Sequence, residues 1–190
     1  MRDDGAMSRW FADVAPTEAE VAAVRPGDDI VADADVVMDR AFTVDGAPDE
    51  VWPWLLQLGK QRAGWYLPHR LERIIPRGRR AIRRLDERWQ QLAVGDVIPD
   101  YGGRHATFTV AIIEPPTTLA YESQRGKTHL TWAITLTWDG ARPAGLTRVH
   151  LRLRLGPVRR LWLAEHVGGM FDLLTIAGMA AGLRERLDEP

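Results

Sequence analysis

The feature that most constrains the fold is a long region, residues 94 to 155, in which apolar and polar residues alternate. The clearest segment places Leu130, Trp132, Ile134, Leu136 and Trp138 on one face and His129, Thr131, Ala133, Thr135 and Thr137 on the other. A period of two is typical of antiparallel strands that have one buried and one solvated face. Turn residues separate the segments. We therefore predict strands at about 95–99, 106–114, 118–123, 128–138 and 146–155.

The same alternation assigns faces to two histidines. By parity, His129 and His150 are expected on the solvated face of this sheet.

Before this region the sequence predicts one more strand and two helices. Residues 36–44 read as a strand, and Pro48, Asp49 and Glu50 then open a helix with the residue types favoured in a first turn. An amphipathic helix over 82–92 is predicted by the apolar spacing of Ile82, Leu85, Trp89 and Leu92.

After this region, residues 159–187 predict one long helix. Its expected apolar face carries Leu163, Val167, Met170, Leu174, Ala177 and Ala181, with Phe171 alongside. Gly168, Gly169, Gly178 and Gly182 lie inside this segment. An interior glycine costs about 1 kcal/mol relative to alanine, so several of them indicate a close backbone approach or a face left open.

This order of elements predicts an α+β fold, with one curved antiparallel sheet and helices on one side. A strand ending in Phe42-Thr43-Val44, followed by the sequence Ala-Pro-Asp-Glu-Val-Trp at 47–52, resembles the N-terminal signature of the START-like (SRPBCC) superfamily. Gly95–Ile98 and the strand pair from Phe108 to Tyr121 fit the same pattern. That superfamily includes polyketide cyclase and dehydrase-like proteins and lipid-transfer domains.

The resemblance covers about residues 34 to 187. It implies a helix-grip fold, in which the curved sheet wraps around the long C-terminal helix and encloses an apolar cavity. It carries over no catalytic residue, because the superfamily shares no invariant catalytic motif. We divide the chain into an N-terminal helical extension, 1–33, and a START-like domain, 34–190. The extension and an Arg-rich insert at 69–92 depart from the usual pattern.

The extension is expected to contain a short helix at 7–13 and a capping box formed by Thr17 and Glu20. Two readings stay open: Trp10, Phe11, Val21 and Val24 pack on the main domain, or the segment is a mobile tail.

Composition excludes several classes of function. Without cysteine there is no disulfide framework, cysteine zinc site or thiol nucleophile, and the two serines, Ser8 and Ser123, lie in no nucleophile motif. The five histidines lack ligand spacing, and no nucleotide-binding glycine motif is present, so we expect no metal and no cofactor. A net charge of -1 argues against nucleic acid as a partner. The acidic first 30 residues favour a cytoplasmic protein.

One cluster of charge stands apart from this balance. Residues 70–88 contain Arg70, Arg73, Arg77, Arg79, Arg80, Arg83, Arg84 and Arg88. A basic amphipathic helix can contact anionic membrane surfaces, although a solvated helix face is the reading we favour.

Candidate ligand-binding residues fall on the expected inward faces and rim loops. The aromatic candidates are Trp54, Trp65, Tyr66, Tyr101, Tyr121, Trp132 and Phe171, with Met170 beside the last. Aromatic side chains suit a flat apolar ligand, although core packing is the alternative for each. Arg40 could fix a carboxylate or hydroxyl, pair with Glu122, or point to water. Asp100, Tyr101 and His105 could supply polar anchors or acid–base groups, or form a solvated glycine turn.

These residues support two main hypotheses. In the first, the protein binds a hydrophobic small molecule, such as a lipid, a polyketide or an aromatic metabolite, between its last helix and its sheet. In the second, the same cavity belongs to a cyclase or dehydratase that uses Asp100, Tyr101 and His105 for proton transfer. A third reading makes the protein an interaction module that docks through the Arg-rich segment. The sequence leaves carrier, sensor and enzyme open.

Overall fold

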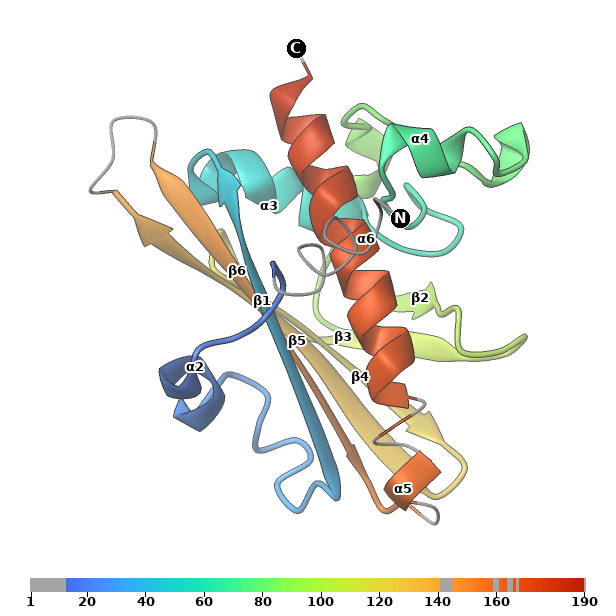
Figure 1. Ribbon diagram of the computed structural model, residues 1–190. Helices are drawn as coiled ribbons and strands as arrows, with labels where there is room; N and C mark the ends of the chain where they lie inside the picture. Colours follow the sequence, from blue (N-terminus) through green and yellow to red (C-terminus); the bar gives the residue numbers. More distant parts are fainter. Residues whose placement is uncertain (1–12, 141–144, 159–160, 164–165, 167, 190) are drawn as a thin grey trace, which may run out of the picture.

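The computed structural model describes residues 13–140, 145–158, 161–163, 166 and 168–189, and it has one antiparallel sheet of six strands (Figure 1). The strand order across the sheet is β1-β6-β5-β4-β3-β2. The strands are β1 (Val36–Asp45), β2 (Val97–Pro99), β3 (Thr107–Glu114), β4 (Thr118–Arg125), β5 (Thr128–Asp139) and β6 (Leu146–Gly156). All six predicted strands are confirmed to within about two residues at each end.

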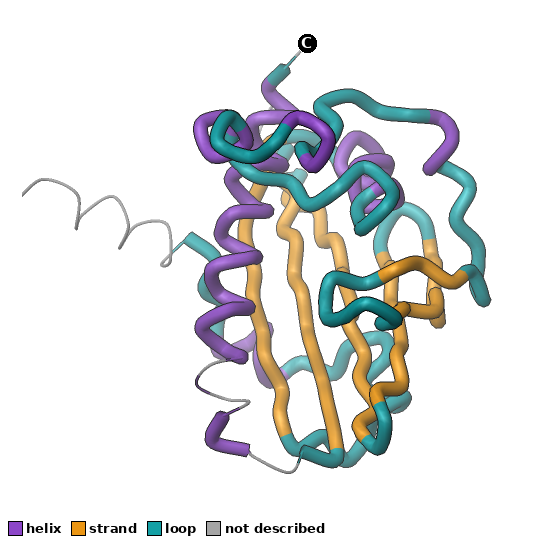
Figure 2. Tube along the Cα trace, turned by 90° about the vertical axis from the view of Figure 1, so that its right-hand side faces the viewer, coloured by secondary structure: helices purple, strands orange, loops and turns teal. Residues whose placement is uncertain are grey.

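One long helix, α6 (Gly169–Asp188), runs along one face of this sheet (Figures 1 and 2). The helix α3 (Pro48–Gln57) follows β1, as predicted, and lies with the insert over one end of the strands. The remaining helical elements are short: α2 (Glu18–Ala22), α4 (His69–Glu72), η1 (Arg77–Arg79), η2 (Glu87–Trp89) and α5 (Leu161–Leu163). This arrangement confirms the α+β helix-grip architecture. Among the described helices, none combines the length and apolar character that crossing a bilayer demands.

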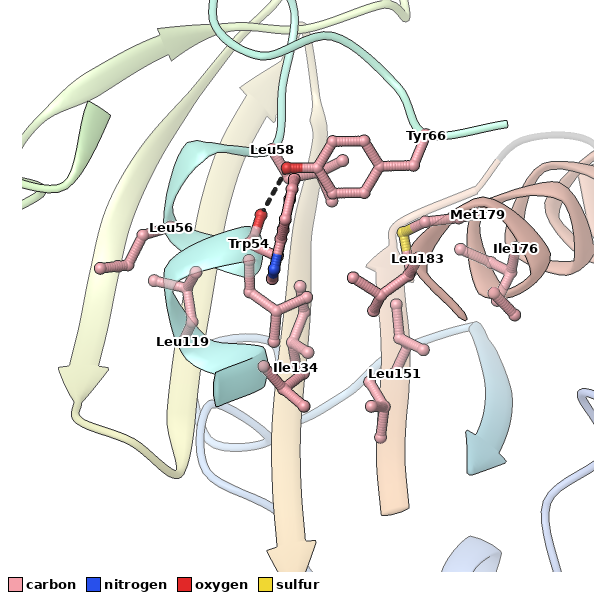
Figure 3. Close-up of a cluster of buried hydrophobic side chains, with 14 of the residues drawn as sticks. Trp54, Leu56, Leu58, Tyr66, Leu119, Ile134, Leu151, Ile176, Met179 and Leu183 are labelled. Carbon is pink, nitrogen blue, oxygen red and sulfur yellow. Dashed lines mark hydrogen bonds between the residues drawn. The ribbon is translucent and has the colours of Figure 1, made fainter. Parts of the chain in front are cut away.

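The core lies between the sheet, α3 and the C-terminal half of α6 (Figure 3). Phe42, Leu119, Ile134 and Leu151 project from the strands and are buried. Ile176, Met179, Ala180 and Leu183 meet them from α6, and Val51 and Leu55 from α3. The Tyr66 hydroxyl is also buried there and donates a hydrogen bond of 2.8 Å to the Trp54 carbonyl.

The apolar face predicted for the last helix was wrong in phase, although one of its members, Ala177, is buried. Met170 is 60% exposed and Leu174 is half exposed, whereas the buried face runs through Ile176, Met179 and Leu183. Val167 and the side chain of Leu163 lie outside the described residues. The buried face also carries charged residues, Arg186 at one end and the largely buried Asp172 at the other, so its apolar pattern is interrupted.

Two glycines let α6 pack at van der Waals distance from Leu67, which lies in the segment just before α4. A Cβ atom on Gly182 would lie 2.5 Å from the backbone nitrogen of Leu67, and one on Gly178 would lie 2.8 Å from a Leu67 methyl carbon. The glycines at these two positions therefore mark the close backbone approach that the sequence indicated.

The helix predicted over 82–92 does not form. Two buried side chains instead bind the backbone of this segment: Gln57 Nε2 donates to the Arg84 carbonyl, and Arg186 Nε donates to the Ile82 carbonyl. Gln57 Oε1 also accepts from the Asp86 amide at 3.0 Å. These bonds engage backbone groups that a helix would use internally, so the segment follows the surface of the domain as loop and a single short turn.

Several arginines of the 70–88 cluster bind within the chain. Arg83 contacts the carboxylates of Glu72, Glu185 and Glu189, at 3.0, 3.1 and 2.6 Å. Arg88 pairs with Asp86 at 2.5 Å. The charge of this segment therefore stabilises its own loop conformation in part.

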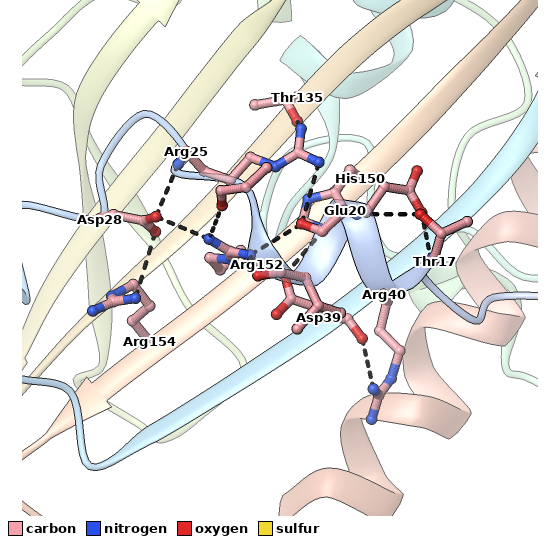
Figure 4. A network of polar contacts seen from close by, with 12 residues as sticks. Thr17, Glu20, Arg25, Asp28, Asp39, Arg40, Thr135, His150, Arg152 and Arg154 are labelled. Carbon is pink, nitrogen blue, oxygen red and sulfur yellow. Dashed lines mark hydrogen bonds and ion pairs between the residues drawn. The ribbon is translucent and has the colours of Figure 1, made fainter.

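The outer face of the sheet is covered by residues of the extension (Figure 4). Arg152, on β6, is buried and binds Asp39 Oδ1 at 2.8 Å, Asp28 Oδ2 at 2.9 Å and the Val21 carbonyl at 2.7 Å. Arg148 binds Glu20 at 2.7 Å. The expected capping box at Thr17 and Glu20 is present.

This cover corrects two expectations about the sheet and the extension. His150 is 3% exposed, not solvated, because the extension closes the face that its parity indicated. It lies 3.0 Å from Asp39, and although burial disfavours that carboxylate, bonds from His150 and Arg152 keep the pKa of Asp39 below its ordinary value. Val24 is 90% exposed and Val21 about half exposed, so these two expected contacts do not form, whereas Val14 and Val31 of the extension are buried. Trp10, Phe11 and the helix expected at 7–13 lie outside the described residues.

The close approach at Gly182 can be tested with a matched pair of substitutions. We expect Gly182→Ala to lower the free energy of unfolding by about 2 kcal/mol or more, since the new methyl group meets backbone that cannot rotate away. Gly169→Ala, at the start of the same helix, meets nothing within 4 Å and is expected to be neutral or slightly stabilising. Urea denaturation measures both. Equal effects of the two substitutions would contradict this packing.

Candidate functional site

A cavity of about 760 Å³ lies between the N-terminal half of α6 and the sheet. Every strand contributes at least one lining residue, so the cavity spans the width of the sheet. From the strands the lining residues are Met38, Ile98, Pro99, Phe108, Arg125, Leu130, Trp132, Leu153 and Leu155. From α6 and the residue before it they are Gly168, Phe171, Asp172, Thr175 and Ile176, and from the loops Leu58, Gly59, Lys60, Trp65, Asp100, Tyr101, Gly102 and Gly103.

The space exists because the two halves of α6 carry different side chains toward the sheet. The C-terminal half inserts Met179 and Leu183 into the core. The first turns present Gly168, Asp172 and Thr175 instead, none of which has a long apolar side chain. The nearby Phe171 is 68% exposed and leaves the interior unfilled.

A cluster of aromatic rings forms one wall of the cavity. Trp132, in the middle of β5, stacks on Trp65 with ring centroids 5.9 Å apart and on Tyr121 with centroids 5.8 Å apart. Phe108 packs against both Tyr121 and Trp132, at 5.8 and 6.2 Å. The result is a continuous cluster of stacked and tilted rings, which comes from the sheet and from the loop that carries Trp65.

Trp65 is held in place from two sides. Its indole nitrogen donates a hydrogen bond of 3.1 Å to the Thr175 carbonyl of α6. The loop that carries it turns through Gly59 and Gly64, which pair with each other and have positive φ angles. A Cβ on Gly64 would lie 2.9 Å from the Ala81 backbone, so glycine is needed there.

The polar groups at the β2 side of the cavity are bound to one another. Arg125 pairs with Asp100 and lies over the Phe108 ring at 5.5 Å. Lys60 Nζ donates to the Asp100 and Gly103 carbonyls at 2.9 and 3.2 Å. Partial burial, with a contribution from Asp100, raises the pKa of Tyr101. These contacts fix the 100–103 loop over the cavity.

A buried ion pair closes the opposite side. Arg40 Nε, from β1, lies 3.0 Å from Asp172 Oδ2, from α6, although neither of these two buried atoms has a hydrogen-bond partner of good geometry. Burial raises the pKa of the Asp172 carboxyl to about 6; Arg40 opposes this rise and Asp39 adds to it. Among the described residues whose pKa is shifted, Asp172 is therefore the cavity carboxyl group with the pKa nearest neutral pH.

The structure places the sequence candidates in two groups. Trp65, Asp100, Tyr101, Trp132 and Phe171 line the cavity. Arg40, Trp54, Tyr66, His105, Tyr121 and Met170 do not.

The candidates outside the lining have other surroundings. Trp54 and Tyr66 belong to the core, and Tyr121 supports Trp132 from behind. Met170 and His105 are exposed. Arg40 pairs with Asp172 and not with Glu122, which instead lies 3.2 Å from His129. His105 therefore does not join Asp100 and Tyr101 at the cavity.

Sequence reasoning missed the polar lining residues Asp172, Thr175, Lys60 and Arg125. A signal for Asp172 was available, because it is the only charged residue in the apolar stretch from Gly168 to Leu183. Among the described residues, no group of three or more potential metal ligands is present.

Comparison with known proteins shows the fold. No protein-family model matches the chain, and no curated protein matches its sequence at a significant level. The hypothetical protein jhp0584 from Helicobacter pylori superposes with a TM-score of 0.53 and 15% identity, over 90% of this chain and 98% of that one. CV1439 from Chromobacterium violaceum gives 0.50 and 11%, over 81% and 99%.

A third solved structure is DynU16, from the dynemicin biosynthetic locus. It superposes with a TM-score of 0.51 and 14% identity, over 80% of this chain. The match spans 47% of DynU16, about half of its length. At these identities the likeness concerns the fold alone, which is the helix-grip fold that the resemblance to the START-like superfamily implied.

The titration of Asp172 gives a prediction about stability. A carboxyl with a raised pKa binds its proton more tightly in the folded protein, so its contribution to the free energy of unfolding falls as pH rises from about 4 to 6. We expect wild type to lose about 3 kcal/mol relative to Asp172→Asn over this interval. Urea denaturation at a series of pH values measures the difference.

A matched variant, Asp188→Asn, removes a carboxylate from the exposed end of the same helix and is expected to follow the wild-type profile. A difference between wild type and Asp172→Asn that stays constant with pH would show that Asp172 titrates normally.

Proposed function

We propose that this protein binds a flat, hydrophobic small molecule in the cavity between α6 and the sheet. The observation that carries the proposal is the cavity itself, with its aromatic wall of Trp65, Trp132 and Phe108. A volume of about 760 Å³ falls within the range of small-molecule sites. A lipid, a polyketide and an aromatic metabolite are the ligand classes that fit this description.

The aromatic content of the wall favours a planar ligand. Trp132 and Tyr121 are stacked with an interplanar angle of 20°, and Trp65 lies at 30° to Trp132. A planar ligand can make stacked or edge contacts with the rings of this cluster, and these aromatic contacts add to the gain from burying its apolar surface. The apolar residues Leu130, Leu153 and Leu155 extend the same surface along the strands.

The polar groups of the cavity support binding rather than an acid–base dyad. Asp100, Arg125 and Lys60 already engage one another or nearby carbonyls. Asp172 is the observation that favours the second candidate, a cyclase or dehydratase, because a pKa of about 6 suits proton transfer near neutral pH. Among the described lining residues there is no histidine, and the other carboxyl, Asp100, is paired with Arg125, so carriage is the function that we favour.

A cavity-filling substitution tests the proposal. Leu153→Trp places a large side chain in the cavity, and we expect it to weaken binding of N-phenyl-1-naphthylamine at least tenfold, because the probe and the new indole compete for the same space. Leu174→Trp makes the same chemical change on the half-exposed side of α6 and is expected to change affinity less than twofold. Probe fluorescence on titration gives both constants.

Native mass spectrometry of freshly purified protein complements the titration by weighing any molecule that is retained. Equal binding by the two variants, or no binding of the probe by wild type, would count against the cavity as a ligand site.

A further inference from the structure

We propose that Asp172 recognises the ligand as a hydrogen-bond acceptor, and that the ligand therefore carries a neutral hydroxyl group, as a phenol does, on its flat apolar body. This inference rests on the proposed function and adds the polar chemistry of the ligand to it. It uses a residue that lies on α6, across the cavity from the 100–103 loop.

The Asp172 carboxylate lacks a well-aligned hydrogen-bond donor. The side chain lines the cavity and is 15% exposed, yet its buried Oδ2 has no hydrogen-bond partner of good geometry among the described residues, although Arg40 Nε lies 3.0 Å away. Buried carboxylates normally have several donors, because an unpaired one carries a large desolvation cost. A donor on a bound molecule would supply what the protein leaves out.

Arg40 is already occupied. Its Nη1 donates to the Asp39 carbonyl at 2.7 Å, its Nη2 donates to the Gly169 carbonyl at 3.0 Å, and its Nε faces Asp172. Figure 4 shows this side chain reaching from β1 toward α6. Each guanidinium nitrogen thus has an oxygen beside it, which disfavours an anionic ligand here. This side of the cavity is therefore expected to accept a hydrogen bond from the ligand.

The other charged groups around the cavity already have partners within the protein. Lys60, Asp100 and Arg125 are held together at the β2 side. Asp39 belongs to the outer face, where Arg152 and His150 bind it. Among the described lining residues, Asp172 is therefore the carboxylate that has an ion-pair partner, Arg40, but a buried oxygen with no well-aligned donor.

Thr175 is the nearest competitor for this role. Its hydroxyl donates to the Phe171 and Asp172 carbonyls at 2.9 Å, so its proton is engaged within α6. It retains lone pairs that could accept a bond, and a test must separate it from Asp172.

The charge state of Asp172 makes the recognition dependent on pH. With its pKa raised by burial to about 6, the side chain is a carboxylate at pH 7.5 and mostly protonated at pH 5. A carboxylate accepts a stronger hydrogen bond than a neutral carboxyl group does. The preference for a hydroxyl ligand should be complete above this pKa and decline as pH falls through it, with Arg40 and Asp39 as the charged neighbours that set the midpoint.

The test compares 2-naphthol with 2-methoxynaphthalene, which lacks the donor, by isothermal titration calorimetry on the full chain. Hydrogen bonds to charged groups correspond to roughly tenfold or more in affinity, so we expect wild type to prefer 2-naphthol by about that factor at pH 7.5. Asp172→Asn is expected to reduce the preference to about threefold or less, whereas the isosteric Thr175→Val retains it. In wild type, the preference should shrink at pH 5.

The outcomes separate the two proposals. If wild type binds both naphthalenes equally well, or if Thr175→Val abolishes the preference while Asp172→Asn keeps it, the role of Asp172 is refuted and the cavity remains a binding site. If neither compound binds, the proposed function fails and this inference fails with it. Should Asp172→Asn not fold, the pH dependence of the wild-type preference decides: a preference that is constant between pH 5 and 7.5 refutes the role.

Discussion

The fully buried guanidinium of Arg186 ties α6 to the loops that lie over the end of the sheet. It binds the Glu72 carboxylate at 2.5 Å, donates to the Ile82 and Gly182 carbonyls at 3.0 and 2.8 Å, and lies over the Tyr66 ring at 4.4 Å. Removing one partner of such a buried group is costly, because the other charge is left without compensation. The C-terminal half of α6 is therefore fixed tightly, and the helix is gripped at this end.

The other half of α6 lies over the cavity and is tied to the rest of the fold by Trp65 and Arg40. Trp65 reaches the helix through the Thr175 carbonyl, and Arg40 reaches it through Asp172 and the Gly169 carbonyl. Between these two supports the helix spans the cavity without filling it. The sheet opposite is stiffened from behind, since the extension binds Arg152 and Arg148 on its outer face. The aromatic wall thus stands on a sheet that is covered where it would otherwise be solvated.

Residue patterns predicted most of the backbone, and the reasons for the failures are physical. Alternation along β5 and the capping residues of α3 act locally, so they are visible in the sequence. The phase of α6 was missed because Asp172 and Arg186 sit on its buried face and break the apolar period. The insert was read as a helix because the bonds from Gln57 and Arg186 that hold it in a loop come from distant parts of the chain.

The candidate site shows the same division. Trp65 and Trp132 could be placed at the cavity because the strand pattern and a loop aromatic indicate them directly. Lys60 and Arg125 could not, since only the folded backbone brings them to Asp100. Interpreting His150 required knowing that the extension covers the outer face, which parity within β6 does not reveal.

The central claim is that α6 stands off the sheet over a cavity that receives a flat ligand with a hydroxyl group. A crystal structure of the protein grown with 2-naphthol tests it most directly. We expect the naphthalene rings between Trp132 and the first turns of α6, with the naphthol oxygen within hydrogen-bond distance of Asp172. An α6 packed against Trp132 and Leu153 with no space between them, or a naphthol bound away from Asp172, would contradict it.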